Sequence, residues 1–271
     1  MPAFDIEAVT RQLRAAGCVF AEDEARMLGG GARSAGELAE LVARRVAGEP
    51  LEYILGWAEF RGVRVGVRAG VFVPRRRSAL LVDEAAALAR STPPRIVVDL
   101  CCGSGALGLA LLTELAGGPD PLPELFAADI DPVAADCARA NLAGIGGRVF
   151  QGDLFDALPS QLCGRIDVLL ANTPYVPSEF LSRLPPEARD HEPATALDGG
   201  PDGLVLARRT AAGAAEWLAP GGSVLIEIGT DQIPAATAVL TGSGLRARIA
   251  RSAELGATVA AGTRPAATYG P

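Results

Sequence analysis

The sequence I-V-V-D-L-C-C-G-S-G, residues 96–105, decides the fold class. Residues 96–100 form a short apolar run with β-branched side chains, which predicts a buried strand. A helical pattern over residues 106–115 follows at once, so the glycines occupy a strand-to-helix turn. Glycine lets the backbone approach a ligand closely, and the amino end of a helix favours polar or anionic groups. A Gly-x-Gly alone is weak evidence for a binding site, but the residues after it strengthen the interpretation.

A second predicted strand, residues 125–128, ends in Asp129. Asp129 follows Gly105 by roughly the 20 residues at which nucleotide-binding βαβ units place an acid for the ribose hydroxyls. Further strands are predicted at 148–151, 166–171, 223–228, 245–249 and 257–261, and helices at 80–89, 131–141, 204–218 and 232–240. Strands that alternate with helices predict an α/β fold with a mostly parallel sheet covered on both faces.

The first part of the chain has a different pattern. Apolar residues recur at helical spacing over residues 1–48, interrupted by Gly29-Gly30-Gly31, which predicts a small helical domain. Residues 63–68 alternate valine with arginine or glycine, which is typical of a half-buried strand. We therefore expect three units: a helical domain over 1–48, a β-hairpin linker over 49–77 and the α/β domain over 78–271.

The tetrapeptide Asn172-Thr173-Pro174-Tyr175 directly follows the predicted strand 166–171. Open α/β sheets bind their ligands at the carboxyl ends of the strands. Asn172 offers a side-chain carbonyl acceptor and Thr173 a backbone carbonyl, while Pro174 restricts the turn. Two acceptors beside the aromatic ring of Tyr175 could hold a planar NH2 group. An ordinary strand-to-loop exit is the alternative for this tetrapeptide taken alone.

Composition excludes several classes of function. A net charge of −7 argues against a broad phosphate-binding surface, although a local basic patch is compatible with it. The five cysteines lack metal-ligand spacing and the chain has one histidine, so we expect no metal site and reduced thiols in a cytoplasmic protein. The amino terminus lacks the features of a secretory signal, and the most apolar window is interrupted by glycines and charges, so no membrane span is predicted.

The order of these segments resembles the class I S-adenosylmethionine-dependent methyltransferases. More narrowly, it is similar to the HemK/PrmC-type protein-(glutamine-N5) methyltransferases, which methylate the Gly-Gly-Gln glutamine of peptide-chain release factors. The segments that carry this resemblance span nearly the whole chain: G-E-P-L-E-Y-I-L-G-W-A-E-F (48–60), V-F-V-P-R (71–75), V-D-L-C-C-G-S-G-A (98–106), A-A-D-I-D (127–131), G-D-L-F (152–155), N-T-P-Y (172–175), E-P-A-T-A-L-D-G-G (192–200) and A-P-G-G-S-V-L-I-E-I-G (219–229). The resemblance implies a Rossmann-like domain with a seven-stranded sheet and S-adenosyl-L-methionine as the cofactor.

The resemblance also implies roles for individual residues. The residues that it assigns to the cofactor are Cys101, Cys102, Gly103, Ser104, Gly105, Asp129, Asp153, Leu154 and Asn172. It assigns the catalytic and substrate-binding roles to Asn172, Thr173, Pro174 and Tyr175, with Arg75 on the substrate side. A carboxamide nitrogen is a poor nucleophile, so two acceptors that fix its N–H bonds would act by orientation and electrostatics rather than as a strong base. Tyr175 would lie near the developing positive charge.

Three departures from the family pattern are present. Thr173 stands where the family usually has proline, V-F-V-P-R-R-R-S (71–78) replaces V-x-I-P-R-P-E-T, and Cys101-Cys102 replaces Gly-Thr. The run Arg75-Arg76-Arg77 is compatible with a solvated face or with attraction of an acidic protein surface.

Two other functions stay open at this point: an N6-adenine type nucleic-acid amino-methyltransferase and a catalytically idle cofactor-binding interaction protein. The expected partner is a protein substrate, first of all a release factor, with no membrane or nucleic acid. The sequence does not report the oligomeric state.

Overall fold

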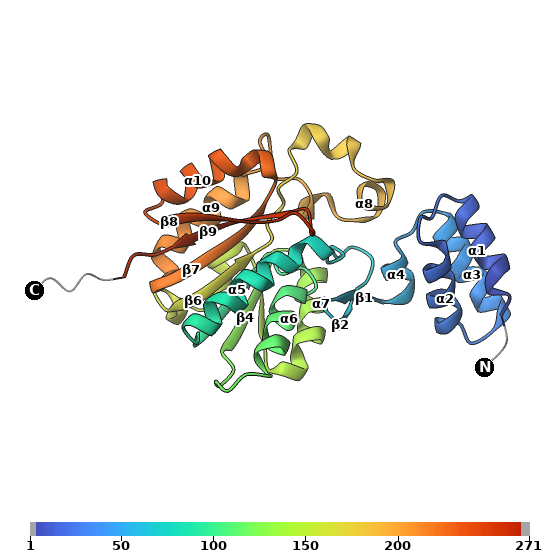
Figure 1. Ribbon diagram of the computed structural model, residues 1–271, viewed down its shortest axis with the longest axis horizontal. Helices are drawn as coiled ribbons and strands as arrows, with labels where there is room; N and C mark the ends of the chain where they lie inside the picture. Colours follow the sequence, from blue (N-terminus) through green and yellow to red (C-terminus); the bar gives the residue numbers. More distant parts are fainter. Residues whose placement is uncertain (1–3, 267–271) are drawn as a thin grey trace, which may run out of the picture.

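The computed structural model describes residues 4–266, which form a helical part and a larger α/β part (Figure 1). The helical part consists of α1 (Ile6–Ala15), α2 (Ala21–Gly31), α3 (Ala35–Val46) and the short α4 (Leu51–Leu55). A two-stranded antiparallel hairpin, β1 (Trp57–Phe60) and β2 (Val63–Gly66), connects it to the α/β part. The division of the chain into three units with boundaries at residues 48 and 77 stays a prediction.

The helical part has an apolar core of its own. Leu13, Leu28 and Val42 from its three longer helices are buried together. Ile54 of α4 belongs to the same cluster, so this core continues past the predicted end of the domain at residue 48. The three consecutive glycines do not interrupt a helix but form the last turn of α2, because Gly29 packs closely against Ile6 of α1.

The α/β part is built on a seven-stranded sheet in the order β5-β4-β3-β6-β7-β9-β8. The strands are β3 (Ile96–Leu100), β4 (Glu124–Asp129), β5 (Arg148–Gln151), β6 (Ile166–Ala171), β7 (Leu218–Ile228), β8 (Arg246–Ser252) and β9 (Ala257–Thr263). All neighbours are parallel except β9, which is antiparallel to both β7 and β8. The predicted mostly parallel, seven-stranded Rossmann-like sheet is confirmed.

Helices cover both faces of this sheet. On one face, α5 (Ala79–Ser91), α6 (Ala106–Leu115) and α7 (Pro132–Leu142) pack against side chains such as Val97. On the other, α9 (Val205–Trp217) and α10 (Ile233–Gly242) pack against side chains such as Val98. All five residues of β3 are buried, as expected for a central parallel strand. This explains why its sequence is a continuous apolar run with one acid rather than an alternating pattern.

The segment between β6 and α9 contains a short helix that the sequence does not predict. This helix is α8 (Pro186–His191). Arg45 of α3 contacts this helix by an ion pair with Glu187, and it also donates to Glu24 over 2.6 Å from Nε to Oε2. A six-residue helix that depends on tertiary contacts has no periodicity that a sequence could reveal.

The topology places a binding site at one edge of the sheet. The strand order reverses between β3 and β6. After β3 the chain adds β4 and β5 on one side of β3, and it then returns to add β6 and β7 on the other side. Ligands of open α/β sheets bind outside the carboxyl ends of the strands at such a point. Among the described residues, no helix is long and apolar enough to cross a membrane.

The carboxyl group of Asp99 in β3 is completely buried beneath α6. Its Oδ2 accepts from the Gly108 backbone N–H at 3.1 Å, while Oδ1 has no partner among the described residues. Burial raises the pKa of Asp99 from the ordinary 3.8 to about 7, and the nearby Asp129 adds to this effect. The folded state therefore binds a proton that the unfolded chain releases near pH 4.

We predict that this proton makes stability fall as the pH rises. The contribution of Asp99 is fully present below pH 4 and is lost as the pH passes through about 7, with a slope of up to about 1.4 kcal/mol per pH unit. Chemical denaturation from pH 4 to 8 should show this loss in the wild type and much less in Asp99→Asn. An exposed control, Asp136→Asn on α7, should keep the wild-type slope. Equal slopes in all three proteins would show that Asp99 does not titrate in this range.

Candidate active site

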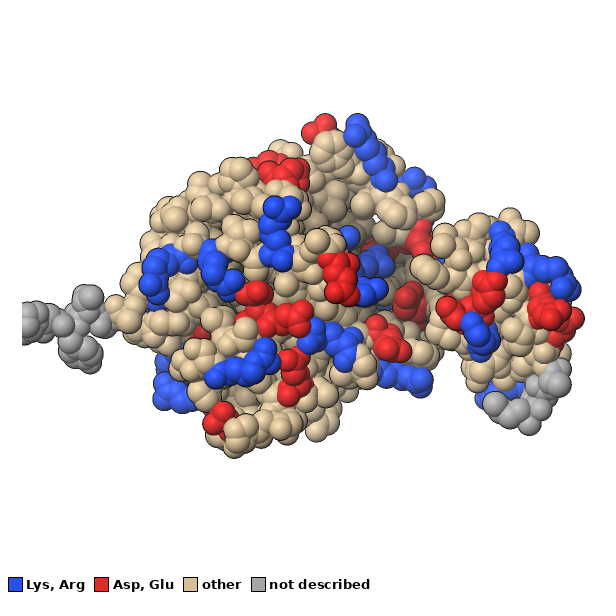
Figure 2. Space-filling model, in the orientation of Figure 1, with Lys and Arg blue, Asp and Glu red and all other residues tan. Residues whose placement is uncertain are grey.

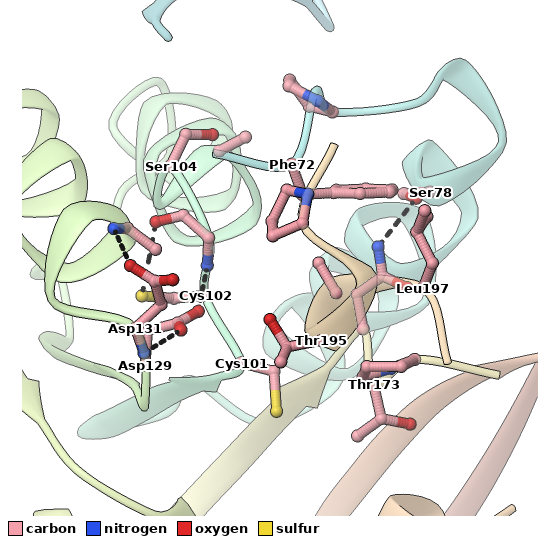
Figure 3. A pocket seen from close by; sticks show the side chains of 18 of the residues that line it. Phe72, Ser78, Cys101, Cys102, Ser104, Asp129, Asp131, Thr173, Thr195 and Leu197 are labelled. Carbon is pink, nitrogen blue, oxygen red and sulfur yellow. Dashed lines mark hydrogen bonds between the residues drawn. The ribbon is translucent and has the colours of Figure 1, made fainter. Parts of the chain in front are cut away.

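A cavity lies at the carboxyl ends of β3, β4 and β6, at the predicted edge of the sheet (Figure 3). Figure 3 shows Asp129 and Asp131 toward one side of it, Ser78 and Thr173 toward the other, and Cys101 and Thr195 between them. The turn after β3 and the tetrapeptide after β6 therefore face one common space. The sequence predicted both segments separately, and the structure brings them together.

The turn between β3 and α6 has a left-handed backbone at three positions. Cys101, Gly103 and Gly105 have φ angles of 53°, 55° and 76°. A side chain at Gly105 would meet Leu142 and Ala138 at 3.1–3.3 Å, so glycine is required there by both conformation and space. Cys101 adopts the same conformation with a side chain, which costs about 1–2 kcal/mol. The cysteine that departs from the family pattern thus keeps the backbone path, and its side chain lines the cavity.

Asp129 joins this turn to the end of β4. Its Oδ2 accepts from the Gly103 N–H at 2.8 Å, and its Oδ1 accepts from the Asp131 N–H at 2.9 Å. Burial raises the pKa of Asp129, and these backbone N–H groups oppose that rise. Each carboxylate oxygen has a second lone pair, so Asp129 can shape the turn and still accept from hydroxyl groups in the cavity.

The Asn172 side chain is held in one orientation from outside the tetrapeptide. Its Nδ2 donates to the hydroxyl of Ser78, which precedes α5, over 3.3 Å. Among the described residues, its Oδ1 accepts no hydrogen bond and is available to a donor in the cavity. Thr173 is 1% exposed and also lines the cavity. Asn172 and Thr173 therefore both line the cavity, and their roles as a pair of acceptors stay a prediction.

Tyr175 contacts both members of an ion pair between the half-exposed Arg77 and the buried Glu227. Its hydroxyl donates to Oε1 of Glu227 at 2.9 Å, and Arg77 Nε donates to the same oxygen at 3.2 Å. The Arg77 guanidinium carbon lies 5.5 Å from the centre of the Tyr175 ring. Glu227 is the next-to-last residue of β7 and is 2% exposed, and its Oε2 has no partner among the described residues. Burial, with the charge of Glu227, raises the pKa of Tyr175, so the phenol is neutral and cannot act as a base.

The backbone of the tetrapeptide is fixed by the loop before α9 and by Gln232. The Gln232 amide donates to the Tyr175 carbonyl at 2.9 Å and to the Asp202 carbonyl at 3.0 Å, while its Oε1 accepts from the Gly229 N–H. Gly203 packs so closely that a Cβ atom would lie 2.2 Å from the Tyr175 carbonyl oxygen. These contacts leave the turn little freedom to move.

Some predicted site residues lie away from the cavity. Asp153 forms an ion pair with Arg209 at 2.8 Å, and Leu154 is buried; neither lines the cavity, so their contact with adenine stays a prediction. Arg75 also lies outside the lining and pairs with the buried Glu192 at 2.6 Å.

The solvated-face interpretation of the arginine run fits Arg76 best, whose side chain is 80% exposed. The side chains of Arg75 and Arg77 are 34% and 45% exposed, so they are partly solvated, but each of them also pairs with a buried carboxylate.

Several lining residues were not identified from the sequence. They are Phe72, Ser78, Ile130, Thr195 and Leu197. All five lie in or directly beside segments that carry the family resemblance, so their neighbourhood was known. Their orientation was not, because the lining side chains come from elements far apart in the sequence.

Comparison with known proteins places the chain in a family. No family model matches it. Among curated proteins, it is 40% identical over 194 residues to the release factor glutamine methyltransferase of Geobacter sulfurreducens, covering 71% of this chain and 65% of that protein. It is 38% identical over 209 residues to the release factor glutamine methyltransferase of Gloeobacter violaceus, covering 75% and 70%. The chain belongs to this methyltransferase family.

Other similar proteins act on different acceptors. The chain is 36% identical over 208 residues to the 4-amino-L-phenylalanine/4-methylamino-L-phenylalanine methyltransferase of Streptomyces pristinaespiralis, covering 75% of this chain and 69% of that protein. A solved 16S rRNA N2 G1207 methyltransferase of T. thermophilus, in complex with AdoMet and guanosine, superposes with a TM-score of 0.52 at 21% identity, covering 77% of this chain and 49% of that one. The superposition supports the methyltransferase fold.

We predict that Gly203→Ala strongly destabilises the protein. The added Cβ would overlap the Tyr175 carbonyl and the Gln232 amide in addition to straining a φ of +74°. Gly221→Ala is the matched control, because its φ is +85° and nothing lies within 4 Å of the added atom. Chemical denaturation should show a further loss of about 1–3 kcal/mol for Gly203→Ala over Gly221→Ala. Equal losses would mean that the tetrapeptide is not tightly packed against this loop.

Proposed function

We propose that this protein transfers a methyl group from S-adenosylmethionine to the side-chain amide nitrogen of a glutamine in another protein. The leading substrate is the Gly-Gly-Gln glutamine of a peptide-chain release factor, the activity for which the relatives are named. One observation carries the proposal: a single cavity joins the glycine turn after β3 to the two acceptors at Asn172 and Thr173. A donor and an acceptor bound at its two ends would meet inside it.

The residues at the Asp129 end fit the proposed cofactor. The left-handed turn brings backbone close to the cavity at Gly103, and Asp129 supplies carboxylate oxygens for ribose hydroxyls. Apolar side chains such as Ile130 and Leu107 line the same region and suit an adenine ring. The bound cofactor would supply a methyl group activated by a positively charged sulfur.

The residues at the other end fit a primary amide. The Asn172 Oδ1 and the Thr173 carbonyl would each accept one N–H bond of the glutamine, which directs the nitrogen lone pair toward the methyl group. The amide nitrogen held in this way would accept the methyl group, the sulfonium would become a neutral thioether, and one amide proton would pass to solvent water. The face of the Tyr175 ring would stabilise the positive charge that develops on the nitrogen. This chemistry relies on orientation, because no strong base lies among these residues.

Mass spectrometry of purified release factor, after incubation with the protein and labelled S-adenosylmethionine, tests the proposed substrate. We expect a label on the Gly-Gly-Gln glutamine. Parallel incubations contain DNA, RNA, cell-extract proteins and free 4-amino-L-phenylalanine, an aromatic amine that presents the same planar NH2 group. Labelling of another acceptor, with no label on the release factor, would support methyl transfer but reject the release factor as the substrate. No label on any acceptor would support the alternative of a catalytically idle protein.

A nucleic-acid acceptor has less support. Basic and acidic side chains are interspersed on the face shown in Figure 2, where no broad basic surface is seen, and the net charge is −7. Proteins that bind nucleic acid usually gather their basic residues on one face. The rRNA enzyme of similar fold supports the methyltransferase architecture and not the acceptor.

We predict that Asp129→Ala weakens cofactor binding by roughly 1.5–3 kcal/mol, the range for hydrogen bonds to a charged group. The change removes the proposed ribose contact and also the acceptor that holds the Gly103 N–H. Calorimetry with S-adenosylmethionine or its demethylated product measures the effect. The exposed control Asp136→Ala should bind normally. Unchanged cofactor affinity in Asp129→Ala would show that the cofactor does not bind at this end of the cavity.

We predict that Asn172→Ala separates chemistry from cofactor binding. Turnover should fall about 10²-fold, the scale for the loss of one preorganised polar partner, while cofactor affinity stays nearly intact. Single-turnover assays and calorimetry measure the two effects. Ser78→Ala should give a smaller loss of turnover, because it only frees the Asn172 amide to rotate, and Ser78→Thr should restore it. An equal loss of cofactor affinity in Asn172→Ala would place this side chain mainly in the cofactor site.

A further inference from the structure

Arg77 is a charged group on the cavity wall that the proposed chemistry does not use. It lines the cavity beside Tyr175, and its side chain is 45% exposed. Its ion pair with Glu227 engages only Nε. Among the described residues, Glu227 is the one carboxylate with which Arg77 pairs, so the guanidinium keeps donors for another acceptor.

Arginines elsewhere in this protein show that one guanidinium can serve two carboxylates. Arg45 pairs with Glu24 through Nε and with Glu187 through a terminal nitrogen. Arg61 pairs with Asp83 and Glu114 through its two terminal nitrogens, at 2.7 and 2.6 Å. Arg77 has the same capacity but has used one site only. Its pairing with Glu227 therefore does not prevent it from binding an anion in the cavity.

The position of Arg77 places it at the acceptor end of the cavity. The other charged side chains that line the cavity, Asp129 and Asp131, lie in Figure 3 on the side opposite to Thr173 and to Ser78, the residue after Arg77. Arg77 therefore supplies a positive charge beside the tetrapeptide, next to the ring of Tyr175.

We propose that Arg77 forms an anion subsite, so that the preferred methyl acceptor carries a carboxylate in addition to the NH2 group that is methylated. The inference rests on the proposed function in that Asn172 and Thr173 must hold the NH2 group. The carboxylate has two possible sources: an acidic residue beside the target glutamine in a protein, or the carboxylate of a free amino acid. A bidentate Arg–carboxylate contact is strong and directional, which suits selection among acceptors.

Arg77 also offsets the buried charge of Glu227, and this role alone would explain its presence. The two roles differ in what they predict. Charge compensation predicts no preference between a charged and a neutral acceptor in the wild type. An anion subsite predicts that the wild type prefers the charged acceptor and that this preference disappears when Arg77 is replaced. The preference should persist or rise in Glu227→Gln, because this change removes the carboxylate that competes for Arg77. The glutamine still offers an acceptor for the Tyr175 hydroxyl.

The test uses two pairs of acceptors, each differing only in one carboxylate. One pair is a Gly-Gly-Gln peptide with aspartate or its methyl ester next to the glutamine, and the other is 4-amino-L-phenylalanine and its methyl ester. We expect the wild type to favour the charged member of at least one pair about tenfold or more in kcat/KM, the scale of a hydrogen bond to a charged group. The pair that shows the preference identifies the source of the carboxylate. Rising salt concentration should reduce the preference.

The variants are Arg77→Gln, Glu227→Gln and the matched control Arg76→Gln. Arg76 is the neighbouring arginine, is 80% exposed and does not line the cavity, so its replacement should leave the preference as in the wild type. Arg77→Gln should abolish the preference, and thermal denaturation checks that it folds. Ratios near one for both pairs in the wild type, or an unchanged ratio in Arg77→Gln, would overturn the proposal.

Calorimetry with the same acceptors, in the presence of the demethylated cofactor, measures the affinity of the subsite without turnover. A preference in binding without methylation would reject the proposed function and keep the anion subsite. Methylation of charged and neutral members at equal rates, with equal affinities, would keep the proposed function and reject the subsite.

Discussion

The hydrogen bond from the Gln232 amide to the Tyr175 carbonyl fixes the turn on which the active site depends. An amide nitrogen becomes a useful nucleophile only if its lone pair is held toward the methyl group, so its two acceptors must not move. Gln232 immobilises the backbone after Pro174, Ser78 orients the Asn172 side chain, and the absent side chain of Gly203 lets the loop close onto the turn. The proposed chemistry therefore depends on packing around the four residues of the tetrapeptide.

Arginine connects that rigid site to the rest of the molecule. The chain has no lysine, and arginine provides all of its positively charged side chains. Arg75 binds the buried Glu192, and Arg45 of the helical part binds Glu187, so both ends of the segment around α8 are held by residues from the amino-terminal third. The same segment continues into Thr195 and Leu197 on the cavity wall. The planar guanidinium suits these positions because it can bind one carboxylate at two points or two carboxylates at once.

The sequence predicted the strands of the sheet well, because each strand is marked by a short apolar run in its own residues. Strand β3 is a five-residue apolar run and β6 ends in an abrupt polar tetrapeptide, and both have the predicted bounds. It could not predict α8, whose six residues depend on Arg45 and Glu192 rather than on periodicity. The adjacent residues Arg75, Arg76 and Arg77 have three different environments, because the backbone turns at this point and two of them meet buried carboxylates from distant strands and loops. The cavity residue Ser78 was missed for the same reason: its partner Asn172 is 94 residues away.

The most direct test of the central claim is a crystal structure with the demethylated cofactor and a glutamine-containing acceptor peptide bound together. The account predicts that the glutamine nitrogen lies within about 3.2 Å of both the Asn172 Oδ1 and the Thr173 carbonyl oxygen, with the cofactor sulfur on the far side of the space that the methyl group would occupy. The cofactor ribose should contact Asp129. A glutamine amide bound away from the tetrapeptide, or turned so that its oxygen faces the cofactor sulfur, would contradict the account.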